Sequence, residues 1–508
     1  MVGCRVLATF FIENFGCRAT DADTSGLRAA LVKSGLKACA DAADADFVVL
    51  NTCTVTGAAD SQARDAVRKV HRANPGAKIV VTGCYAQRAP EEIAGIDGVS
   101  WVVGNARQRE IPSLLAPESS GRGPGIGSDC LAAGSFVPLD HLRQTELSLA
   151  RGPAKILTGD IFEQTTLQLE SQGTVLGARD RTRPILKIQD GCNNRCAYCV
   201  IPLVRGRSRS LAPDSVVQEA RSFVAAGAKE IVLSGINLGS YGRDLNPRAG
   251  LAGVVKRILD ETTLEHLRLS SIEPQDVTQD FVAMVAGSRR IAPHFHVPLQ
   301  SGSNRILRAM HRWYRAELYA ERIGVIRRLL PDAAIGADVI AGFPGETEQD
   351  FLETVTFIER QPLTYLHVFS FSPRPGTKAD HLGQLVPPAE IRERARYLRS
   401  LSARSSAAFR AAQAGRVLSA LTLHRQGDGW TEALTRNYLK VRIAGLLPAN
   451  EWRKIVLGAA DGEVCSDASK LIFENDLGQS DIATVRDRET DVFHAQPIRE
   501  FPGNAREV

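Results

Sequence analysis

The sequence predicts an α/β protein built from a doubly wound parallel sheet, an open six-stranded α/β barrel and a small C-terminal β-barrel. The first two parts are indicated by short apolar runs that alternate with amphipathic helical stretches, over residues 5–112 and again over 184–373. The third is indicated by short strands and turns over residues 416–463. At 508 residues the chain is too long for one hydrophobic core, and about three domains are expected. The expected boundaries are an N-terminal domain at 1–112, a connector at 113–180, a barrel domain at 181–415, a C-terminal barrel at 416–463 and a tail at 464–508.

The composition narrows the class of protein without naming a function. Hydrophobic residues make up 44% and charged residues 23%, as in ordinary soluble globular proteins. A net charge of +5 permits a polyanionic partner without requiring one. Residues 1–5 do not begin a secretory signal, and no apolar run approaches membrane-spanning length. We therefore expect the ten cysteines to be reduced in a cytoplasmic protein rather than paired in disulfides.

Three cysteines follow the strands expected in the N-terminal domain. The strands are expected at residues 5–12, 46–50 and 78–81, and shortly after them come Cys17, Cys53 and Cys84. The C-terminal ends of parallel strands share one edge of a sheet, so the fold should bring these thiols together. One such cysteine would be interpreted as a small buried residue, but three at equivalent positions favour a three-thiolate cluster site. The remaining cysteines interpreted as incidental are Cys4, Cys39, Cys130 and Cys465.

The stretch between the two α/β regions differs in character from both. Residues 117–127 are rich in Gly, Ser and Pro, which is typical of a flexible linker. The part that follows has mixed polarity, and we interpret residues 113–180 as an inserted connector.

The central region repeats a strand and a helix six times, which predicts a six-stranded barrel open on one side. The strands are expected at residues 185–189, 230–234, 266–270, 294–297, 335–340 and 365–371. Polar residues and glycines recur at successive strand ends, where barrel enzymes place their chemistry. Glycine lets the backbone approach a cofactor, and the polar side chains can bond its ribose and amino groups. The candidate cofactor contacts are Gly235, Asn237, Ser271, Glu273, Gln300 and Asp338.

A Cys-x3-Cys-x2-Cys motif, Cys192, Cys196 and Cys199, follows the first barrel strand and a turn at Gly191. Each thiolate can bind a different iron of one [4Fe–4S] cluster, which leaves the fourth iron without a protein ligand. The amino and carboxylate groups of S-adenosylmethionine can chelate that iron, and one electron then cleaves the sulfonium to a 5′-deoxyadenosyl radical. The stretch resembles the motif of the radical S-adenosylmethionine enzymes. A structural zinc site is the alternative, but it needs a fourth ligand, and no Cys or His lies close downstream of Cys199.

Two places are dense in basic residues, 205–209 after the motif and 305–315, where Arg and His mix with Trp and Tyr. Guanidinium groups suit phosphates and aromatic faces can stack on an exposed base, although a solvated helix face would look similar. A helix is expected at 388–414, followed by strands at 417–423, 431–435, 438–443 and 454–457, which suits a small RNA-binding β-barrel. Residues 464–508 are expected to form a loosely ordered tail. The candidate RNA contacts are Arg205, Arg207, Arg312, Trp313, Asn437 and Tyr438.

The order of these parts resembles the methylthiotransferase family of radical S-adenosylmethionine enzymes, over about residues 1–112 and 180–460. The C-terminal barrel would then be TRAM-like, although it matches loosely, and the connector is longer than usual in the family. Five stretches are most similar to the branch that acts on threonylcarbamoyladenosine in tRNA: 51–56, 82–87, 189–194, 270–274 and 367–370.

The resemblance implies an enzyme that replaces the hydrogen at C2 of N6-threonylcarbamoyladenosine, at position 37 beside the tRNA anticodon, with a methylthio group. It implies two [4Fe–4S] clusters. The cluster on Cys192, Cys196 and Cys199 would bind S-adenosylmethionine and generate the radical. The second, on Cys17, Cys53 and Cys84, would hold the sulfur, and a second S-adenosylmethionine would supply the methyl group.

Further roles are implied by the same resemblance. Tyr198 would pack near the adenosyl group. Because hydrogen abstraction by a carbon radical needs no acid or base, no general base is nominated. The expected partners are the tRNA anticodon stem-loop and an electron donor such as flavodoxin or ferredoxin, while the sulfur donor is left open.

Three other readings are weighed against this one. The substrate could be isopentenyl-adenosine of tRNA or an aspartate of a ribosomal protein. The chain could instead be a non-enzymatic iron–sulfur protein that binds RNA or carries electrons, but a carrier has no use for an open iron or a six-unit barrel. A zinc-dependent RNA-binding module is the last alternative, and metal analysis separates it from the others.

Overall fold

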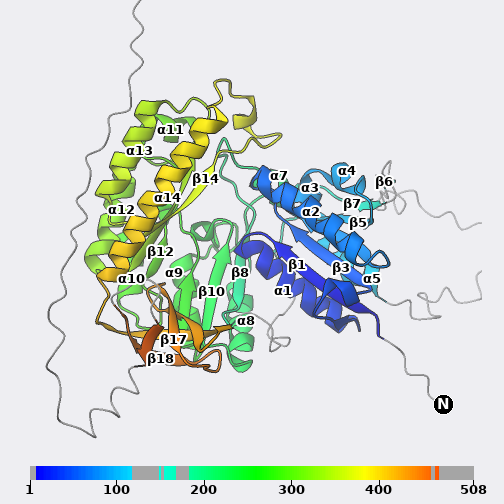
Figure 1. Cartoon of the computed structure of the whole chain (residues 1–508), viewed down its shortest axis with the longest axis horizontal. Coiled ribbons are helices and arrows are strands. Elements are labelled where there is room, and N and C mark those ends of the chain that lie inside the picture. Colours follow the sequence, from blue (N-terminus) through cyan, green and yellow to red (C-terminus); the bar gives the residue numbers. More distant parts are fainter. Residues whose placement is uncertain (1–6, 117–147, 150–153, 168–181, 459–463, 468–508) are drawn as a thin grey trace, which may run out of the picture.

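A computed structural model describes residues 7–116, 148–149, 154–167, 182–458 and 464–467. Figure 1 shows the N-terminal sheet (blue) beside the central barrel (green to yellow), with the C-terminal strands (orange) against the lower end of that barrel. The predicted fold class is confirmed in all three parts. The linker predicted at 117–127, most of the tail, and the incidental residues Cys4 and Cys130 lie outside the described residues.

The N-terminal sheet has the strand order β2-β1-β3-β4-β5-β7-β6. Its strands are β1 Thr9–Phe15, β2 Lys37–Ala38, β3 Phe47–Thr52, β4 Lys78–Gly83, β5 Val99–Gly104, β6 Ser148–Leu149 and β7 Lys155–Leu157. All neighbours are parallel except β6 and β7. The helices are α1 Arg18–Lys33, α2 Gly57–Ala73, α3 Cys84–Arg88, α4 Pro90–Ala94 and α5 Ile111–Leu115.

Helices cover both faces of this sheet because alternate strand residues point to opposite sides. On β3, Val48 and Leu50 pack with residues of α2, whereas Val49 packs with residues of α1 and α5. All three side chains are fully buried. The sheet is therefore doubly wound, as predicted, and the C-terminal ends of its parallel strands lie along one edge.

The connector expected at 113–180 is in part a piece of the N-terminal sheet. Strand β7 pairs in parallel with β5 and so extends the sheet. The described residues after it lead to the central domain, since Ile161 lies against Gly206 and Leu167 packs against the core of that domain. A strand of three residues carries little alternating pattern of its own.

The central domain contains the six predicted strands, β8 Ile185–Asp190, β10 Glu230–Gly235, β11 His266–Leu269, β12 His294–His296, β13 Ala334–Ala341 and β14 Tyr365–Ser370. Strands β8, β10 and β11 pair in parallel, as do β12, β13 and β14, and a single bridge between Leu267 and Ile291 links the two groups. A short strand, β9 Arg209–Ser210, pairs antiparallel with β8. Within the described strands β14 pairs only with β13, so the barrel is open between β14 and β8.

Helices cover the outside of this barrel. They are α7 Ile201–Arg205, α8 Pro213–Ala225, α9 Leu251–Glu261, α10 Gln279–Ala286, α11 Asn304–Ala309, α12 Ala316–Leu329, α13 Glu348–Arg360 and α14 Pro388–Ala411. One large hydrophobic core joins the inner faces of all of these helices except α7 to the strands, whereas Val204 of α7 packs with Cys84 of the N-terminal domain. In the part of the chain that the structure describes, no helix has both the length and the apolar character needed to span a membrane.

The C-terminal strands form a closed barrel in the order β15-β16-β17-β19-β18. They are β15 Val417–Gly427, β16 Trp430–Thr435, β17 Lys440–Ala444, β18 Trp452–Val456 and β19 Val464–Asp467. The first four were predicted, but β19 lies in the stretch expected to be a tail. It pairs with both β17 and β18 and so completes the barrel.

Candidate active site

The three N-terminal cysteines meet at the C-terminal edge of their sheet. Cys17 caps the start of α1 after β1, Cys53 follows β3, and Cys84 begins α3 after β4. All are free thiols, and Cys53 and Cys84 are buried. Burial and the nearby thiols of Cys84 and Cys17 raise the pKa of Cys53 to about 12. The fold thus brings these three thiols, which are far apart in the sequence, close enough that Cys84 and Cys17 affect the pKa of Cys53, as predicted.

The three central cysteines lie on the loop after β8, which several backbone hydrogen bonds fix to the barrel. Cys192 N donates to Gly206 O (3.1 Å) and Ala197 N donates to Met310 O (2.9 Å). Burial is the main reason that the pKa of Cys192 is raised to about 11 and that of Cys199 to about 12. Such thiols stay protonated at neutral pH unless a metal ion replaces the proton.

A glycine with a positive φ angle precedes one cysteine of each set. Gly83 has φ +98°, and a Cβ there would lie 2.4 Å from the carbonyl oxygen of Thr52. Gly191 has φ +67°, and a Cβ would lie 2.0 Å from the carbonyl oxygen of Arg207. Each set of three free, converging thiols fits the donor set that a [4Fe–4S] cluster with one open iron requires.

A cavity of about 190 Å³ lies between the central cysteine motif and the loop that follows Cys53. Val55 and Thr56, which follow Cys53, line one part, and Tyr198 and Cys199 line another. The remaining lining residues come from barrel strand ends and from the turn after the central motif: Val200, Ile201, Gln300, Asp338, Ile340, Phe369, Ser370, Phe371 and Ser372. The walls are mainly apolar, so the cavity suits an aromatic ring more than a hydrated group.

The predicted cofactor contacts are distributed unevenly around this cavity. Tyr198, Gln300 and Asp338 line it. Asn237 and Glu273 lie beside the central cysteines instead, since both influence the pKa of Cys192. Gly235 at the end of β10 and Ser271 after β11 are not among the cavity-lining residues.

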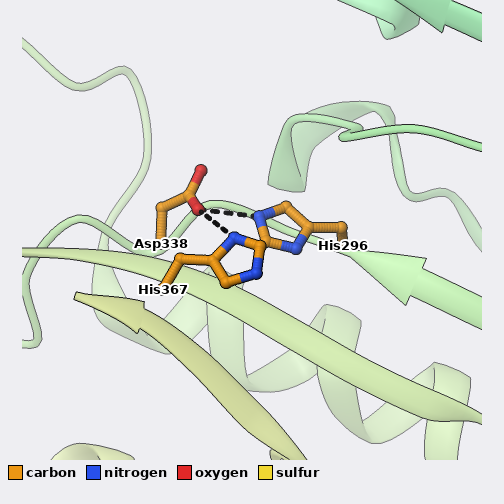
Figure 2. A group of neighbouring side chains, drawn as sticks. All are labelled: His296, Asp338 and His367. Atoms are coloured by element: carbon orange, nitrogen blue, oxygen red, sulfur yellow. Dashed lines mark hydrogen bonds and ion pairs between the residues drawn. The ribbon is translucent and has the colours of Figure 1, made fainter. Parts of the chain in front are cut away.

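Two histidines that sequence reasoning missed hold Asp338 in place (Figure 2). His296 Nε2 donates to Asp338 Oδ1 at 2.8 Å, and His367 Nδ1 lies 3.4 Å from the same oxygen. Burial opposes ionisation of Asp338, but these imidazoles outweigh it and hold the pKa of the carboxyl well below its usual range. His367 is 51% exposed and the three ligand-type atoms lie within 4.8 Å of one another. The available signal was the alternation of 294, 296, 365 and 367, which places polar side chains on the inner face of β12 and β14.

The structure contradicts the expectation that Arg205 and Arg312 bind RNA at the surface. Arg205 is 2% exposed and pairs with Asp190 (3.0 Å) and Asp23 (2.9 Å). The Arg312 side chain is 4% exposed, and its Nη1 donates to the sulfur of Cys196 at 3.3 Å. Both guanidinium groups therefore bind partners inside the protein.

Of the four other candidate RNA contacts, two are exposed and two lie between domains. Arg207 is exposed and Trp313 is 76% exposed, so both remain available. Asn437 is buried and donates to Asp332 O (3.2 Å), while the ring of Tyr438 stacks on His294 with centroids 4.0 Å apart. Asn437 and Tyr438 thus attach the C-terminal barrel to the central domain, which corrects their expected role.

Comparisons with known proteins agree with this layout. Residues 9–104 match the model described as Uncharacterized protein family UPF0004, and residues 186–358 match the Radical SAM superfamily. The chain is 35% identical over 433 residues to the threonylcarbamoyladenosine tRNA methylthiotransferase MtaB of Aquifex aeolicus, covering 85% of this chain and 96% of that protein. It is 33% identical to the tRNA-2-methylthio-N(6)-dimethylallyladenosine synthase of Syntrophobacter fumaroxidans, covering 81% and 84%. Among solved structures, the radical S-adenosylmethionine methyltransferase TsrM from Kitasatospora setae aligns over 74% of each chain with TM-score 0.49 and 15% identity.

Proposed function

The chain belongs to the radical S-adenosylmethionine methylthiotransferase family and is a tRNA methylthiotransferase, and we propose that its substrate is N6-threonylcarbamoyladenosine, modified at C2. The observation that carries the proposal is the cavity between Cys199 of the central set and Val55 and Thr56, which follow Cys53 of the N-terminal set. A target base held there would contact the central set and the loop after Cys53, and a reaction that joins a carbon to a sulfur requires the two to be held close together.

Two groups of residues would hold the cofactors. Cys192, Cys196 and Cys199 would bind one [4Fe–4S] cluster, and a second cluster would be bound by Cys17, Cys53 and Cys84. When bound, the clusters and S-adenosylmethionine supply the radical that removes hydrogen, the sulfur and the methyl group.

The chain's own residues position the reactants and exclude water. Tyr198, Gln300 and Asp338 line the cavity and would orient the adenosyl group and the target base. Asn237, Glu273, Ser271 and Gly235 would complete the S-adenosylmethionine site beside the central cysteines. Apolar side chains such as Phe369 and Phe371 line the cavity and, together with a bound substrate, would shield a reactive radical from water and side reactions.

The polar wall next to the cavity favours the threonylcarbamoyl substrate over the dimethylallyl one. Relatives with either name are 33–35% identical to this chain, so identity alone does not separate them. His296, Asp338 and His367 offer donors and acceptors to a side chain that carries hydroxyl, amide and carboxylate groups (Figure 2). The exposed His367 can pair with a polar group of the threonylcarbamoyl side chain as well as with Asp338, whereas a dimethylallyl group offers it no donor or acceptor.

Two exposed residues support contact with the tRNA anticodon stem-loop. Trp313 presents an aromatic face for stacking, and Arg207 presents a guanidinium for phosphate. Electrons would come from a protein such as flavodoxin or ferredoxin.

The test uses the full chain, reconstituted anaerobically with iron and sulfide and incubated with S-adenosylmethionine and dithionite. Anticodon stem-loops carrying either threonylcarbamoyladenosine or isopentenyl-adenosine are supplied in parallel, and the nucleosides are identified by mass spectrometry. We expect 2-methylthio product only from the first substrate, and none from a Cys192→Ala/Cys196→Ala/Cys199→Ala variant or from a Cys17→Ala/Cys53→Ala/Cys84→Ala variant. Product from the isopentenyl substrate alone would assign the dimethylallyl activity instead. A metal content of one zinc and no iron per chain would contradict the assignment of radical chemistry to this protein.

A further inference from the structure

Arg312 touches the central cysteine set directly. It lies between α11 and α12, and its side chain is 4% exposed. Its Nη1 donates to the sulfur of Cys196 at 3.3 Å, and its Nη2 is paired with the carboxylate of Glu273. Its Nε donates to the hydroxyl of Tyr314 at 3.3 Å, and the guanidinium carbon lies 4.9 Å from the centre of that ring.

The surrounding hydrogen bonds hold this guanidinium in place. The Tyr314 hydroxyl lies 2.9 Å from the carbonyl oxygens of Pro298 and Leu299, at the end of β12. The backbone two residues before Arg312 is tied to the cysteine loop, since Met310 O accepts from Ala197 N at 2.9 Å. Because the side chain is buried, only protein groups contact it, and its charge is little screened by solvent.

A fixed positive charge beside a ligand sulfur affects electron uptake. Reduction adds one electron, and no proton, from a low-potential one-electron donor, so the site gains one negative charge. Hydrogen bonds to the sulfurs and the net charge nearby are two of the factors that set the potential of an iron–sulfur centre. An arginine keeps its charge at every physiological pH, so the effect is permanent.

We propose that Arg312 is a positioning residue that raises the reduction potential of the iron–sulfur site on Cys192, Cys196 and Cys199, by its hydrogen bond to Cys196 and its fixed charge. The inference rests on the proposed cluster at these cysteines. It assigns to Arg312 a task inside the protein, in place of the RNA contact that the sequence suggested.

Glu273 should affect the reduction potential in the opposite direction to Arg312. Its carboxylate is paired with Arg312, whose other guanidinium nitrogen donates to Cys196. It therefore offsets part of the arginine's charge. Removing the carboxylate should raise the potential, whereas removing the guanidinium should lower it.

The experiment measures one cluster at a time. In a Cys17→Ala/Cys53→Ala/Cys84→Ala background, only the central site can hold iron. Iron and sulfide are quantified first, and the midpoint potential is then measured by anaerobic titration with dithionite and EPR, without S-adenosylmethionine. The variants are Arg312→Gln, Arg312→Lys and Glu273→Gln. The matched control is Arg315→Gln, which removes the same charge from an exposed residue three positions away.

We expect a more negative potential for Arg312→Gln, a smaller shift for Arg312→Lys, a more positive potential for Glu273→Gln and no change for Arg315→Gln. Full iron with an unchanged potential in Arg312→Gln would overturn the inference and leave the proposed function intact. If Arg312→Gln does not retain iron, the midpoint potentials of Arg312→Lys and Glu273→Gln test the proposal instead. Shifts in opposite directions would support it, and shifts in the same direction would reject it. No iron in the background protein itself would overturn the cluster assignment and with it this inference.

Discussion

At the scale of single residues, two glycines decide where a cysteine of each set can lie. Gly83 and Gly191 are each followed directly by a cysteine, and each has a positive φ angle close to a neighbouring backbone carbonyl. Any side chain at these positions would both strain the backbone and collide with main-chain atoms that cannot move aside. The position of the thiol therefore depends on the residue before it.

We predict that Gly191→Ala removes the iron of the central set, about half of the total if two clusters are present. The added Cβ would lie 2.0 Å from the carbonyl oxygen of Arg207, so the loop after β8 must shift. A folding cost of at least about 2 kcal/mol is expected from the strained φ and the clash together. Iron analysis and urea unfolding of the reconstituted protein measure both effects.

Gly227→Ala is the matched control for this variant. Gly227 also has a positive φ, +91°, but a Cβ there meets nothing within 4 Å. It should cost about 1 kcal/mol and leave the iron content unchanged. Equal iron in the two variants would show that the position of Cys192 does not depend on Gly191.

Single residues also show what the sequence can and cannot reveal about the site. The six cysteines were found because their spacing and their places after strands are local signals. The roles of Arg205 and Arg312 were predicted wrongly, because burial depends on which residues, distant in the sequence, pack over a side chain. Arg205 pairs with Asp23, 182 positions away, and Arg312 reaches Cys196, 116 positions away.

At the scale of elements, the surrounding pattern separates what was predicted from what was missed. The six barrel strands were all predicted, including β12 with three residues and β11 with four, because strands and helical stretches alternate regularly in this region. Strands β7 and β19, with three and four residues, were assigned to a connector and to a tail. Such short strands are stabilised by the sheet edges that they join, which a local pattern does not contain.

Helix α13 gives a prediction about pH. Asp350 forms a capping box with Thr347, and it also pairs with Arg305 and accepts from Ser303 at 2.9 Å. Burial opposes its ionisation, but these partners outweigh burial and hold the pKa of the carboxyl well below the ordinary 3.8. A lowered pKa in the folded state means that the stabilisation is complete above pH 3.8 and is lost as the pH falls below it.

We predict that Asp350→Asn lowers the free energy of unfolding by about 2 kcal/mol at pH 7. The difference from the wild type should shrink as the pH is lowered below 3.8, because the unfolded wild type then takes up a proton that the folded wild type does not bind. Urea unfolding of the iron-free proteins across this range measures it. Asp280→Asn, an exposed acidic residue in the first turn of α10, should change stability by less than about 0.5 kcal/mol. A cost for Asp350→Asn that stays constant with pH would contradict the assignment.

At the scale of the whole molecule, buried ion pairs hold the N-terminal domain against the barrel on two sides of the site. On one side, Asp23 of α1 pairs with Lys187 of β8 and with Arg205 of α7. On the other, Asp60 of α2 pairs at 2.6 Å with Arg374, which follows β14. The cavity needs lining residues from both domains, so these contacts determine whether the two cysteine sets face each other.

The last prediction concerns the first of these contacts. Asp23→Asn leaves Lys187 and Arg205 with one carboxylate, that of Asp190, between them, and the side chains involved are all less than 10% exposed. Removing one partner from a buried ionic cluster costs about 3 kcal/mol of unfolding free energy, because it leaves a buried positive charge that is neither paired nor hydrated. We expect a lower urea midpoint and faster proteolysis in the iron-free protein. Asp65→Asn is the control, since its pair with Arg68 is mostly exposed and contributes less than about 1 kcal/mol. If both variants unfold at the wild-type midpoint, the ionic cluster does not hold the domains together, and the apolar contacts of Cys84 with Val200, which precedes α7, and with Val204 of α7 must do so.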